Sequence, residues 1–270
     1  MEKRALEPME EASYNRKVIQ LALDAGSTQL SNGAEIWRVD DTISHICRAY
    51  GITDVDAFIL SNAIFITGNN EEEAVFAKVK HIPISGVHLG IITDVNDLSR
   101  EISAGMWTVE EASEKLTEIR NQPPKNQIYR GVASGIASGC FGYILGADLI
   151  ECFITVIVAF SVLMFAMYLE KHCVAKMVKN ILGGGLIAVM ALLVTYVPCF
   201  AGASVDKIII GAIMPLIPGV AFVNSIRDLA NSDFISGTVR MLDTIMVFMY
   251  IAIGAGMALS LYHGILGGAL

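Results

Sequence analysis

The sequence predicts an α-helical membrane protein with about five transmembrane helices and an N-terminal α+β cytoplasmic domain. Mean hydropathy is +0.55, which is too high for a soluble protein with an ordinary polar surface. The charges are uneven, because residues 1–126 hold 12 of the 19 Lys and Arg and 20 of the 27 Asp and Glu, and so account for the net charge of −8. We therefore place the cytoplasmic domain in residues 1–126 and the transmembrane domain in residues 127–270.

Two helices are expected to open the N-terminal domain. Residues 12–30 and 31–51 carry apolar side chains at helical spacing. Ser31 and Asn32 can cap the second helix, and Gly51 can end it.

Three strands are expected next. Residues 54–68 are rich in β-branched and aromatic side chains, and they predict two short strands joined near Ser61-Asn62. Residues 71–73 are expected to form an exposed turn. Residues 74–84 alternate apolar and polar side chains, which is typical of a half-buried strand.

Two further helices complete the predicted domain. They cover residues 88–104 and 108–121, and Thr108 can cap the second. Pro123 and Pro124 then form a stiff linker to the membrane domain.

Five apolar segments follow, each near the ~20 residues that a membrane-spanning helix needs. They cover residues 128–147, 149–169, 178–197, 207–226 and 238–262. The Lys and Arg residues near their ends fall on the side of the N-terminal domain, with Lys207 as the exception. Because positive charge marks the cytoplasmic side, we expect a cytoplasmic N-terminal domain and an extracytoplasmic C-terminus.

The fourth apolar segment contains the most informative residues. Pro215 and Pro218 should break or kink its helix. A broken helix at membrane depth is tolerated where its freed carbonyls face protein or water, and ionisable residues there are usually functional. We therefore predict a substrate-binding site that is formed by Pro218, Gly219, Asn224, Arg227 and Asp228.

The planar guanidinium of Arg227 suits a carboxylate ligand, so the expected substrate is a small carboxylate-bearing metabolite. Asp228 and Asp243 are candidates for carrying a coupled proton or for pairing with Arg240, because a carboxylate near hydrocarbon needs a proton or a partner. An alternative is that Arg227 and Arg240 are cationic helix ends that extend to the cytoplasmic interface.

A second polar group lies in the N-terminal domain. Glu35, Arg38 and Asp41 recur at helical spacing with His45, so they share one face of a helix. This face is either a solvated surface with local ion pairs or an interface that faces the membrane domain or a ligand.

Small residues form a stripe in the first apolar segment, where Gly131, Gly135 and Gly139 repeat every four residues. Such stripes allow helices to approach closely in lipid. The stripe can serve packing within the chain, but we also expect association with a second subunit or with other copies of the chain.

Other function classes are disfavoured. The acidic balance offers no basic stripe for nucleic acid. The cysteines and histidines lack metal-ligand spacing, and the common hydrolase, metalloprotease, P-loop and dinucleotide motifs are missing. We therefore expect neither an enzyme nor a metal or cofactor site. The alternative to a transporter is a membrane-anchored sensor or hydrolase whose activity lies in the N-terminal domain.

Three segments closely resemble the bacterial threonine/serine exporter family. They are SNGAEIWRVDDT (residues 31–42), GVHLGIITDVNDLSREI (86–102) and LIPGVAFVNSIRDLANSDFISGTVR (216–240). The resemblance runs along nearly the whole chain. It implies a multi-pass protein of the bacterial inner membrane that exports threonine, serine or a dicarboxylate such as succinate. From Asp228 and Asp243 we expect this export to be coupled to protons.

The resemblance also implies a partner. Some members of that family carry a second membrane domain, whereas others near this length work with a separate small membrane subunit, and one such pair is associated with succinate export. Because this chain ends after five expected spans, it resembles the larger subunit of the two-subunit type. We therefore expect a small membrane subunit, a homo-oligomer or both as partners, in addition to membrane lipid.

Overall fold

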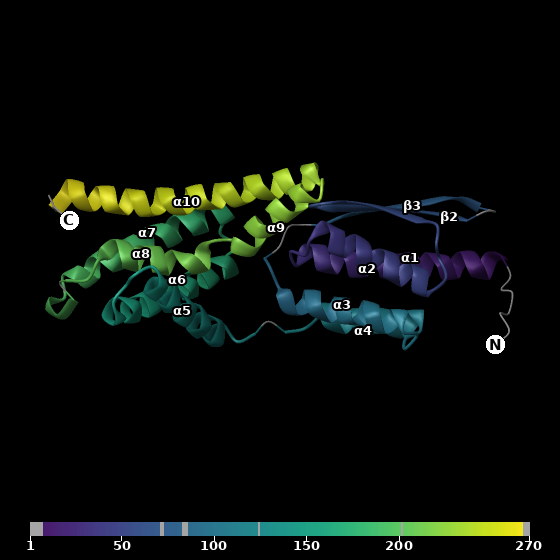
Figure 1. Ribbon diagram of the computed structural model, residues 1–270, viewed down its shortest axis with the longest axis horizontal. Coiled ribbons are helices and arrows are strands. Elements are labelled where there is room, and N and C mark those ends of the chain that lie inside the picture. The colour runs from purple at the N-terminus through teal and green to yellow at the C-terminus, as the bar shows by residue number, and fades with distance from the viewer. Residues whose placement is uncertain (1–7, 71–72, 83–85, 124, 201, 267–270) are drawn as a thin grey trace. The chain divides into compact units, whose positions relative to one another are not determined.

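The computed structural model describes residues 8–70, 73–82, 86–123, 125–200 and 202–266. These residues are mostly helical, with one three-stranded sheet (Figure 1). The chain divides into two compact units, which we call the N-terminal unit (Met1–Pro123 and Val220–Met241) and the helical unit (Pro124–Gly219 and Leu242–Leu270). The N-terminal unit thus includes a segment that the sequence prediction assigned to the membrane domain.

The N-terminal unit begins with a mixture of helices and strands, as the sequence predicts. Its elements are α1 (Pro8–Ser31), α2 (Ile36–Ala49), β1 (Val55–Leu60), β2 (Ala63–Asn70), β3 (Glu73–His81), α3 (Leu89–Ser103) and α4 (Val109–Arg120). α1 and α2 pack between the sheet and the α3–α4 pair (Figure 1). The core is aliphatic and includes the fully buried side chains of Leu23, Ile43 and Ile64.

The sheet is antiparallel with the order β1-β2-β3. Leu60 pairs with Ala63, so Ser61 and Asn62 form the predicted two-residue connection. The third strand begins at Glu73, whereas residues 71–72 of the predicted turn lie outside the described residues.

The start of α2 differs from the sequence prediction. Ser31 is the last residue of α1, and α2 begins at Ile36 with Glu35 at the N-cap position. Gly33 between them has a φ of +86°, a backbone conformation that glycine adopts without steric cost. The chain therefore turns at Gly33, and the predicted cap formed by Ser31 and Asn32 is wrong.

Two other predicted helix boundaries are confirmed. α2 is followed by Gly51, whose φ is +87°, as expected for a glycine that ends a helix. Thr108 accepts a hydrogen bond from the Glu111 amide at 3.3 Å, and Glu111 accepts one from the Thr108 amide at 2.9 Å. This reciprocal capping box fixes the start of α4.

The helical unit contains only helices and short 3-10 turns among its described residues. Its elements are α5 (Gln127–Ile144), α6 (Leu149–Lys171), α7 (Lys176–Thr195), η1 (Pro198–Phe200), α8 (Val205–Ile213) and η2 (Met214–Leu216). Two helices then continue across the boundary between the units, namely α9 (Gly219–Ala230) and α10 (Phe234–Leu266). The helix break predicted at Pro215 and Pro218 is present, because α8 stops at Ile213 and α9 starts at Gly219.

Three helices among the described residues are long and apolar enough to cross a membrane. They are Leu149–Lys171, Lys176–Thr195 and Phe234–Gly264, and a fourth is counted if Val205–Leu216 and Gly219–Ala230 form one broken span. The expected number of five is therefore not confirmed. α5 forms as a helix, but its glycines and serines, together with Gln127 and Arg130, make it less apolar than the others.

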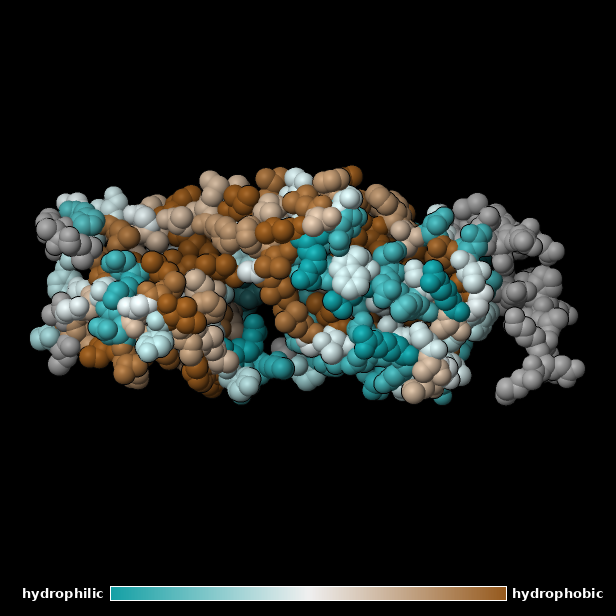
Figure 2. All heavy atoms as spheres, in the orientation of Figure 1, coloured by the Kyte–Doolittle hydropathy of each residue, from teal (hydrophilic) through white to brown (hydrophobic). Residues whose placement is uncertain are grey.

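The surface of the helical unit is strongly apolar. Figure 2 shows apolar side chains gathered over its helices. Leu149 and Ile144 are 78% and 76% exposed, respectively. Contiguous exposed apolar surface of this kind marks contact with a membrane or with another protein.

The glycine stripe of α5 packs against α6. A Cβ atom at Gly135 would lie 2.8 Å from the backbone oxygen of Val156, and one at Gly131 would lie 2.9 Å from the Phe160 ring. The stripe therefore serves packing within the chain, and an association with other subunits does not follow from it.

Glycines also allow a close crossing of α7 and α10. A Cβ atom at Gly184 would overlap the carbonyl group of Ile251, and one at Gly254 would overlap the carbonyl of Ile181. The two backbones are thus in direct contact, as is common for small residues at helix interfaces in membranes.

A buried carboxylate joins α6 and α8. The Glu151 side chain is 4% exposed. Its Oε1 accepts a hydrogen bond from the Ser204 amide at 2.8 Å, and its Oε2 lies 3.3 Å from Lys207 Nζ. Glu151 therefore ties the start of α8 to the first turn of α6.

We expect Gly254→Ala to lower the free energy of unfolding by about 1–3 kcal/mol, because the added methyl group overpacks the crossing of α7 and α10. Gly256 on the same helix is the matched control, since a Cβ atom there meets nothing within 4 Å. Thermal unfolding of the detergent-solubilised protein measures both variants. Equal melting temperatures for Gly254→Ala and Gly256→Ala would contradict the close crossing.

Candidate functional site

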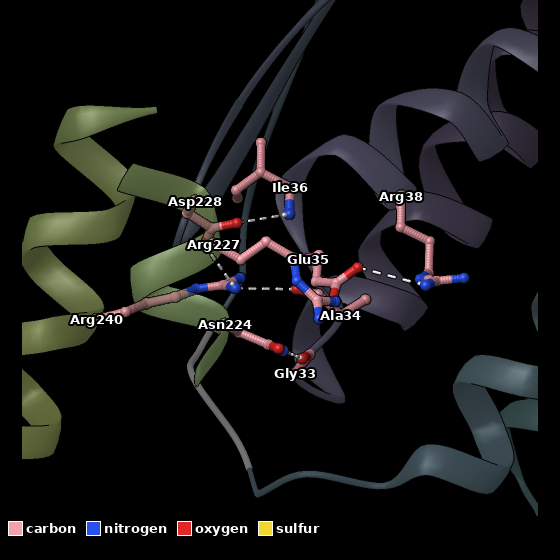
Figure 3. Close-up of polar contacts among 9 residues, drawn as sticks. All are labelled: Gly33, Ala34, Glu35, Ile36, Arg38, Asn224, Arg227, Asp228 and Arg240. Atoms are coloured by element: carbon pink, nitrogen blue, oxygen red, sulfur yellow. Dashed lines mark hydrogen bonds and ion pairs between the residues drawn. The ribbon is translucent and has the colours of Figure 1, made fainter. Parts of the chain in front are cut away.

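The candidate site lies in the N-terminal unit, where α9 and the start of α10 meet the loop between α1 and α2 (Figure 3). Asn224, Arg227 and Asp228 come from α9, and the last two follow Asn224 by three and four residues, so each lies one helical turn from Asn224. These side chains contact the loop, and Arg240 reaches the same loop from α10.

Two side chains bind carbonyl groups of the loop. Asn224 Nδ2 donates a hydrogen bond to the Gly33 oxygen at 3.0 Å, and Arg240 Nη1 donates one to the Ala34 oxygen at 3.0 Å. Both carbonyls lie between α1 and α2, so neither belongs to a helix.

Asp228 caps α2 from a distant part of the chain. The first amide groups of a helix have no partner within the helix, and a negative charge there is favourable. Glu35 occupies the N-cap position, but its side chain makes no capping hydrogen bond. Instead, Asp228 Oδ1 accepts a hydrogen bond from the Ile36 amide at 3.3 Å. Its Oδ2 lies 3.1 Å from Arg240 Nη1, so this fully buried carboxylate has partners on both oxygens.

Glu35 lies between two arginines. Its carboxylate forms an ion pair with Arg227, and its second oxygen lies 3.3 Å from Arg38 Nη2. The Glu35 side chain is 7% exposed, whereas that of Arg227 is 51% exposed. Arg227 therefore binds a carboxylate, as its chemistry predicts, and this carboxylate belongs to the protein itself.

A pocket of about 330 Å³ adjoins this contact. Its polar lining comes from Glu35, Arg38, Thr93, Asn96 and Asn224. A water molecule occupies ~30 Å³ of liquid volume, so a solute of several heavy atoms fits beside Glu35.

The ten residues that line this pocket all come from the three segments that carry the family resemblance. They are Gly33, Ala34, Glu35 and Arg38 from residues 31–42, Leu89, Ile92, Thr93 and Asn96 from residues 86–102, and Val220 and Asn224 from residues 216–240. The most distinctive stretches of the sequence thus converge on one cavity in the N-terminal unit.

Other predicted site residues lie as follows. Pro218 precedes α9 and Gly219 begins it, directly before the pocket-lining Val220. Asp243 lies in the helical unit, where both of its oxygens bind Lys176 Nζ, at 2.8 and 2.7 Å. It is therefore not part of the Arg227 cluster.

The three predicted interface residues also separate. Glu35 contacts α9, and Arg38 supports it through the shared ion pair. Asp41 instead lies 3.6 Å from His45 with half of its side chain exposed, which fits a local pair on a solvated helix face.

Sequence reasoning missed the backbone groups of the site and the α3 side of the pocket. The carbonyls of Gly33 and Ala34 and the amide of Ile36 carry no side-chain signal. Thr93 and Asn96 lie in a segment that carries the resemblance, and this was the available signal for them. Among the described residues, no three His, Cys, Asp or Glu side chains are close enough to hold a metal ion.

We expect Arg240→Gln to destabilise the N-terminal unit by about 3–5 kcal/mol, because it leaves Asp228 buried without its cationic partner. Lys17→Gln is the control, since Lys17 and Glu110 form an exposed pair and such pairs contribute about 0–1 kcal/mol. Hydrogen exchange of the α1 and α2 amides in the full-length protein measures the difference. A loss no larger than that of Lys17→Gln would show that the Asp228–Arg240 pair is not needed for stability.

The comparisons with known proteins identify the family of the chain. The family model described as "Putative threonine/serine exporter" matches residues 20–262. A "Threonine/serine exporter" of Corynebacterium glutamicum is 24% identical over 251 residues, which cover 90% of this chain and 51% of that protein. The chain therefore spans about half the length of that relative. No solved structure matches the chain.

Two relatives correspond to nearly the full length. The "Probable succinate transporter subunit YjjP" of Escherichia coli is 19% identical over 253 residues, covering 93% of this chain and 97% of that protein. The protein of the same name from Klebsiella aerogenes is 22% identical over 260 residues, covering 93% of this chain and 96% of that protein. These relatives are named as an exporter and as transporter subunits, not as enzymes. With its apolar helices and a family match over most of its length, this chain is a multi-pass membrane protein that belongs to the threonine/serine exporter family.

Proposed function

We propose that this chain is a secondary exporter of a small carboxylate-bearing metabolite, either threonine or serine or a dicarboxylate such as succinate. We further propose that export is coupled to protons and that the chain works with a second small membrane subunit. Family membership supports export. The two relatives that correspond to nearly the full chain are named as subunits, which supports a partner.

The observation that carries the proposal is the carboxylate of Glu35 held between two arginines. We infer that the substrate carboxylate replaces Glu35 on Arg227. Arg227 is half exposed and so can be reached, and its guanidinium can hold a carboxylate through two parallel hydrogen bonds. After the exchange Glu35 is still paired with Arg38, and the substrate carboxylate is paired with Arg227. Neither carboxylate is then left without a cation, a loss that costs several kcal/mol for a buried charge.

The exchange connects the solute to the broken helix. In the described state Glu35, Gly33 and Ile36 hold α9 through Arg227, Asn224 and Asp228. Loss of the Glu35–Arg227 pair removes one of these three links. α9 begins directly after the break at Pro218-Gly219. A change in how α9 is attached to the α1–α2 loop is therefore transmitted to this break, where the regular helical hydrogen bonds are interrupted.

Proton coupling has two candidate carboxylates with different surroundings. Asp228 is committed to the Ile36 amide and to Arg240. Asp243 lies within a candidate membrane span, where Lys176 is its ion-pair partner and its side chain is 42% exposed. We therefore propose Asp243 as the proton carrier, because it is partly exposed and is not held in the loop contact that binds Asp228.

The proposed topology places the N-terminal unit in the cytoplasm of a bacterium, with the protein in the inner membrane and the C-terminus outside. It rests on the distribution of Lys and Arg around the apolar helices.

Arg227→Lys tests the substrate site. Lysine keeps the positive charge but lacks the planar pair of donors, so one charge-assisted hydrogen bond to the substrate is lost. Such a bond contributes ~1.5–3 kcal/mol. The apparent affinity for substrate should therefore fall roughly 10- to 150-fold. Glu35→Gln should act in the opposite direction, because a neutral amide competes less well for Arg227. Export from proteoliposomes at matched protein levels, with threonine and succinate as substrates, measures both. Arg130→Lys is the control. Normal export by Arg227→Lys would show that Arg227 only anchors the helix end and does not bind substrate.

Asp243→Asn tests proton coupling. The amide cannot carry a proton in exchange, so we expect transport driven by a pH gradient to be lost, while substrate exchange at equal pH persists. Asp206→Asn, an exposed carboxylate at the start of α8, serves as the control. An unchanged response of Asp243→Asn to the pH gradient would exclude this carboxylate as the carrier.

Cysteine labelling tests the topology. In a variant without native cysteines, Glu118→Cys on α4 should be protected from an impermeant thiol reagent in intact cells, whereas Gly202→Cys between η1 and α8 should react. The reverse pattern would invert the proposed orientation.

A further inference from the structure

The N-terminal unit contains a second pocket, which shares no lining residue with the one beside Glu35. Its volume is about 280 Å³. It lies between the C-terminal turns of α1, the end of β3 and the end of α4, and its polar lining includes Thr28, Asn32, Lys80, His81 and Arg120. The proposed export function assigns no role to this pocket.

The charges around the pocket leave an excess of positive charge. Lys80 Nζ lies 2.5 Å from Asp24 Oδ1 and donates a hydrogen bond to Ser27 Oγ at 2.8 Å, so Lys80 and Asp24 balance one another. Burial raises the pKa of the Asp24 carboxyl, but hydrogen bonds from Lys80 and Gln20 and the charges of Lys80 and Arg120 outweigh it and hold the pKa below its usual value. Arg120 is exposed and supplies the additional cation that an entering carboxylate can bind.

The α1 side of the pocket offers hydrogen-bond acceptors. Thr28 Oγ1 donates its hydrogen to the Asp24 backbone oxygen at 2.7 Å, so the remaining capacity of this hydroxyl is as an acceptor. Asn32 Nδ2 donates to the Thr28 backbone oxygen at 2.7 Å, which leaves the Asn32 side-chain oxygen as an acceptor. A ligand therefore needs hydrogen-bond donors at the α1 side and an anion at the Arg120 side.

We propose that this pocket binds a free α-amino acid. Its carboxylate binds Arg120 with support from His81, and its ammonium group donates to the oxygens of Thr28 and Asn32. A molecule with only a carboxylate satisfies the Arg120 side and leaves the acceptors of the α1 side without donors. The pocket is thus selective for a zwitterion.

The position of Asn32 connects this pocket with the loop that holds α9. Asn32 is followed by Gly33, and its backbone oxygen accepts a hydrogen bond from the His88 amide at 3.1 Å. A ligand on the Asn32 side chain holds the same loop whose Gly33 carbonyl binds Asn224. Through this loop the bound amino acid regulates the exporter, and this regulatory role rests on the proposed function. Binding of the amino acid to the pocket does not depend on what the protein transports.

Hydrogen exchange of the full-length protein in detergent, with L-serine as the probe, tests the proposal. L-serine should slow amide exchange in residues 78–82 and 117–121, which surround the lining residues of this pocket and contain none of the lining residues of the one beside Glu35. Arg120→Gln should raise the concentration for half-maximal protection about tenfold or more, because it removes a charge-assisted contact. Lys115→Gln on the same helix is the control, since Lys115 pairs with Glu118 and does not line the pocket.

The outcomes separate this site from the export site. The proposal is supported if protection of residues 78–82 and 117–121 persists in Arg227→Ala and requires about tenfold or more L-serine in Arg120→Gln, whatever the transport assays show. Absence of protection in the wild-type protein overturns it. Equal protection by propionate, which lacks the ammonium group, or unchanged protection in Arg120→Gln, also overturns it.

Discussion

The hydrogen bond from the Ile36 amide to Asp228 joins parts of the chain that are 192 residues apart. It satisfies a helix end that the local sequence leaves open, and it places a carboxylate at the positive end of α2. Removing an ion from water costs several kcal/mol, and Asp228 is fully buried. Arg240 and the Ile36 amide offset that cost, so the segment Val220–Met241 is an integral part of the N-terminal unit.

This capping arrangement also determines what Glu35 does. A residue at an N-cap position normally uses its side chain to bind the first amides of its own helix. Because Asp228 binds the Ile36 amide, Glu35 is directed toward Arg227 and Arg38 instead. The pocket lies next to this pair. The structural role of one carboxylate thus leaves a second carboxylate to pair with two arginines.

The helical unit is held together by different physics. There, backbones are in contact at glycines, between α5 and α6 and between α7 and α10, and one buried carboxylate joins α6 to α8. Close packing of this kind resists gradual deformation. The break at Pro215 and Pro218 is different, because the helix lacks regular backbone hydrogen bonds there. The break therefore lacks the close packing that fixes the other helices of this unit.

Local patterns in the sequence determined the elements of this protein. Apolar periodicity located the helices, Ser61-Asn62 marked the hairpin connection, and two prolines marked the broken helix, because each of these features depends on neighbouring residues. The family resemblance indicated which segments matter, and these segments supply every lining residue of the pocket. Tertiary structure alone decided which groups the polar side chains of α9 bind. Helical spacing places Arg227 and Asp228 one turn after Asn224, but it contains no information about whether these polar side chains meet solvent, substrate or a loop near residue 35. The start of α2 was misplaced for the same reason, since its capping group comes from α9 and no local rule can find a cap that is 192 residues away.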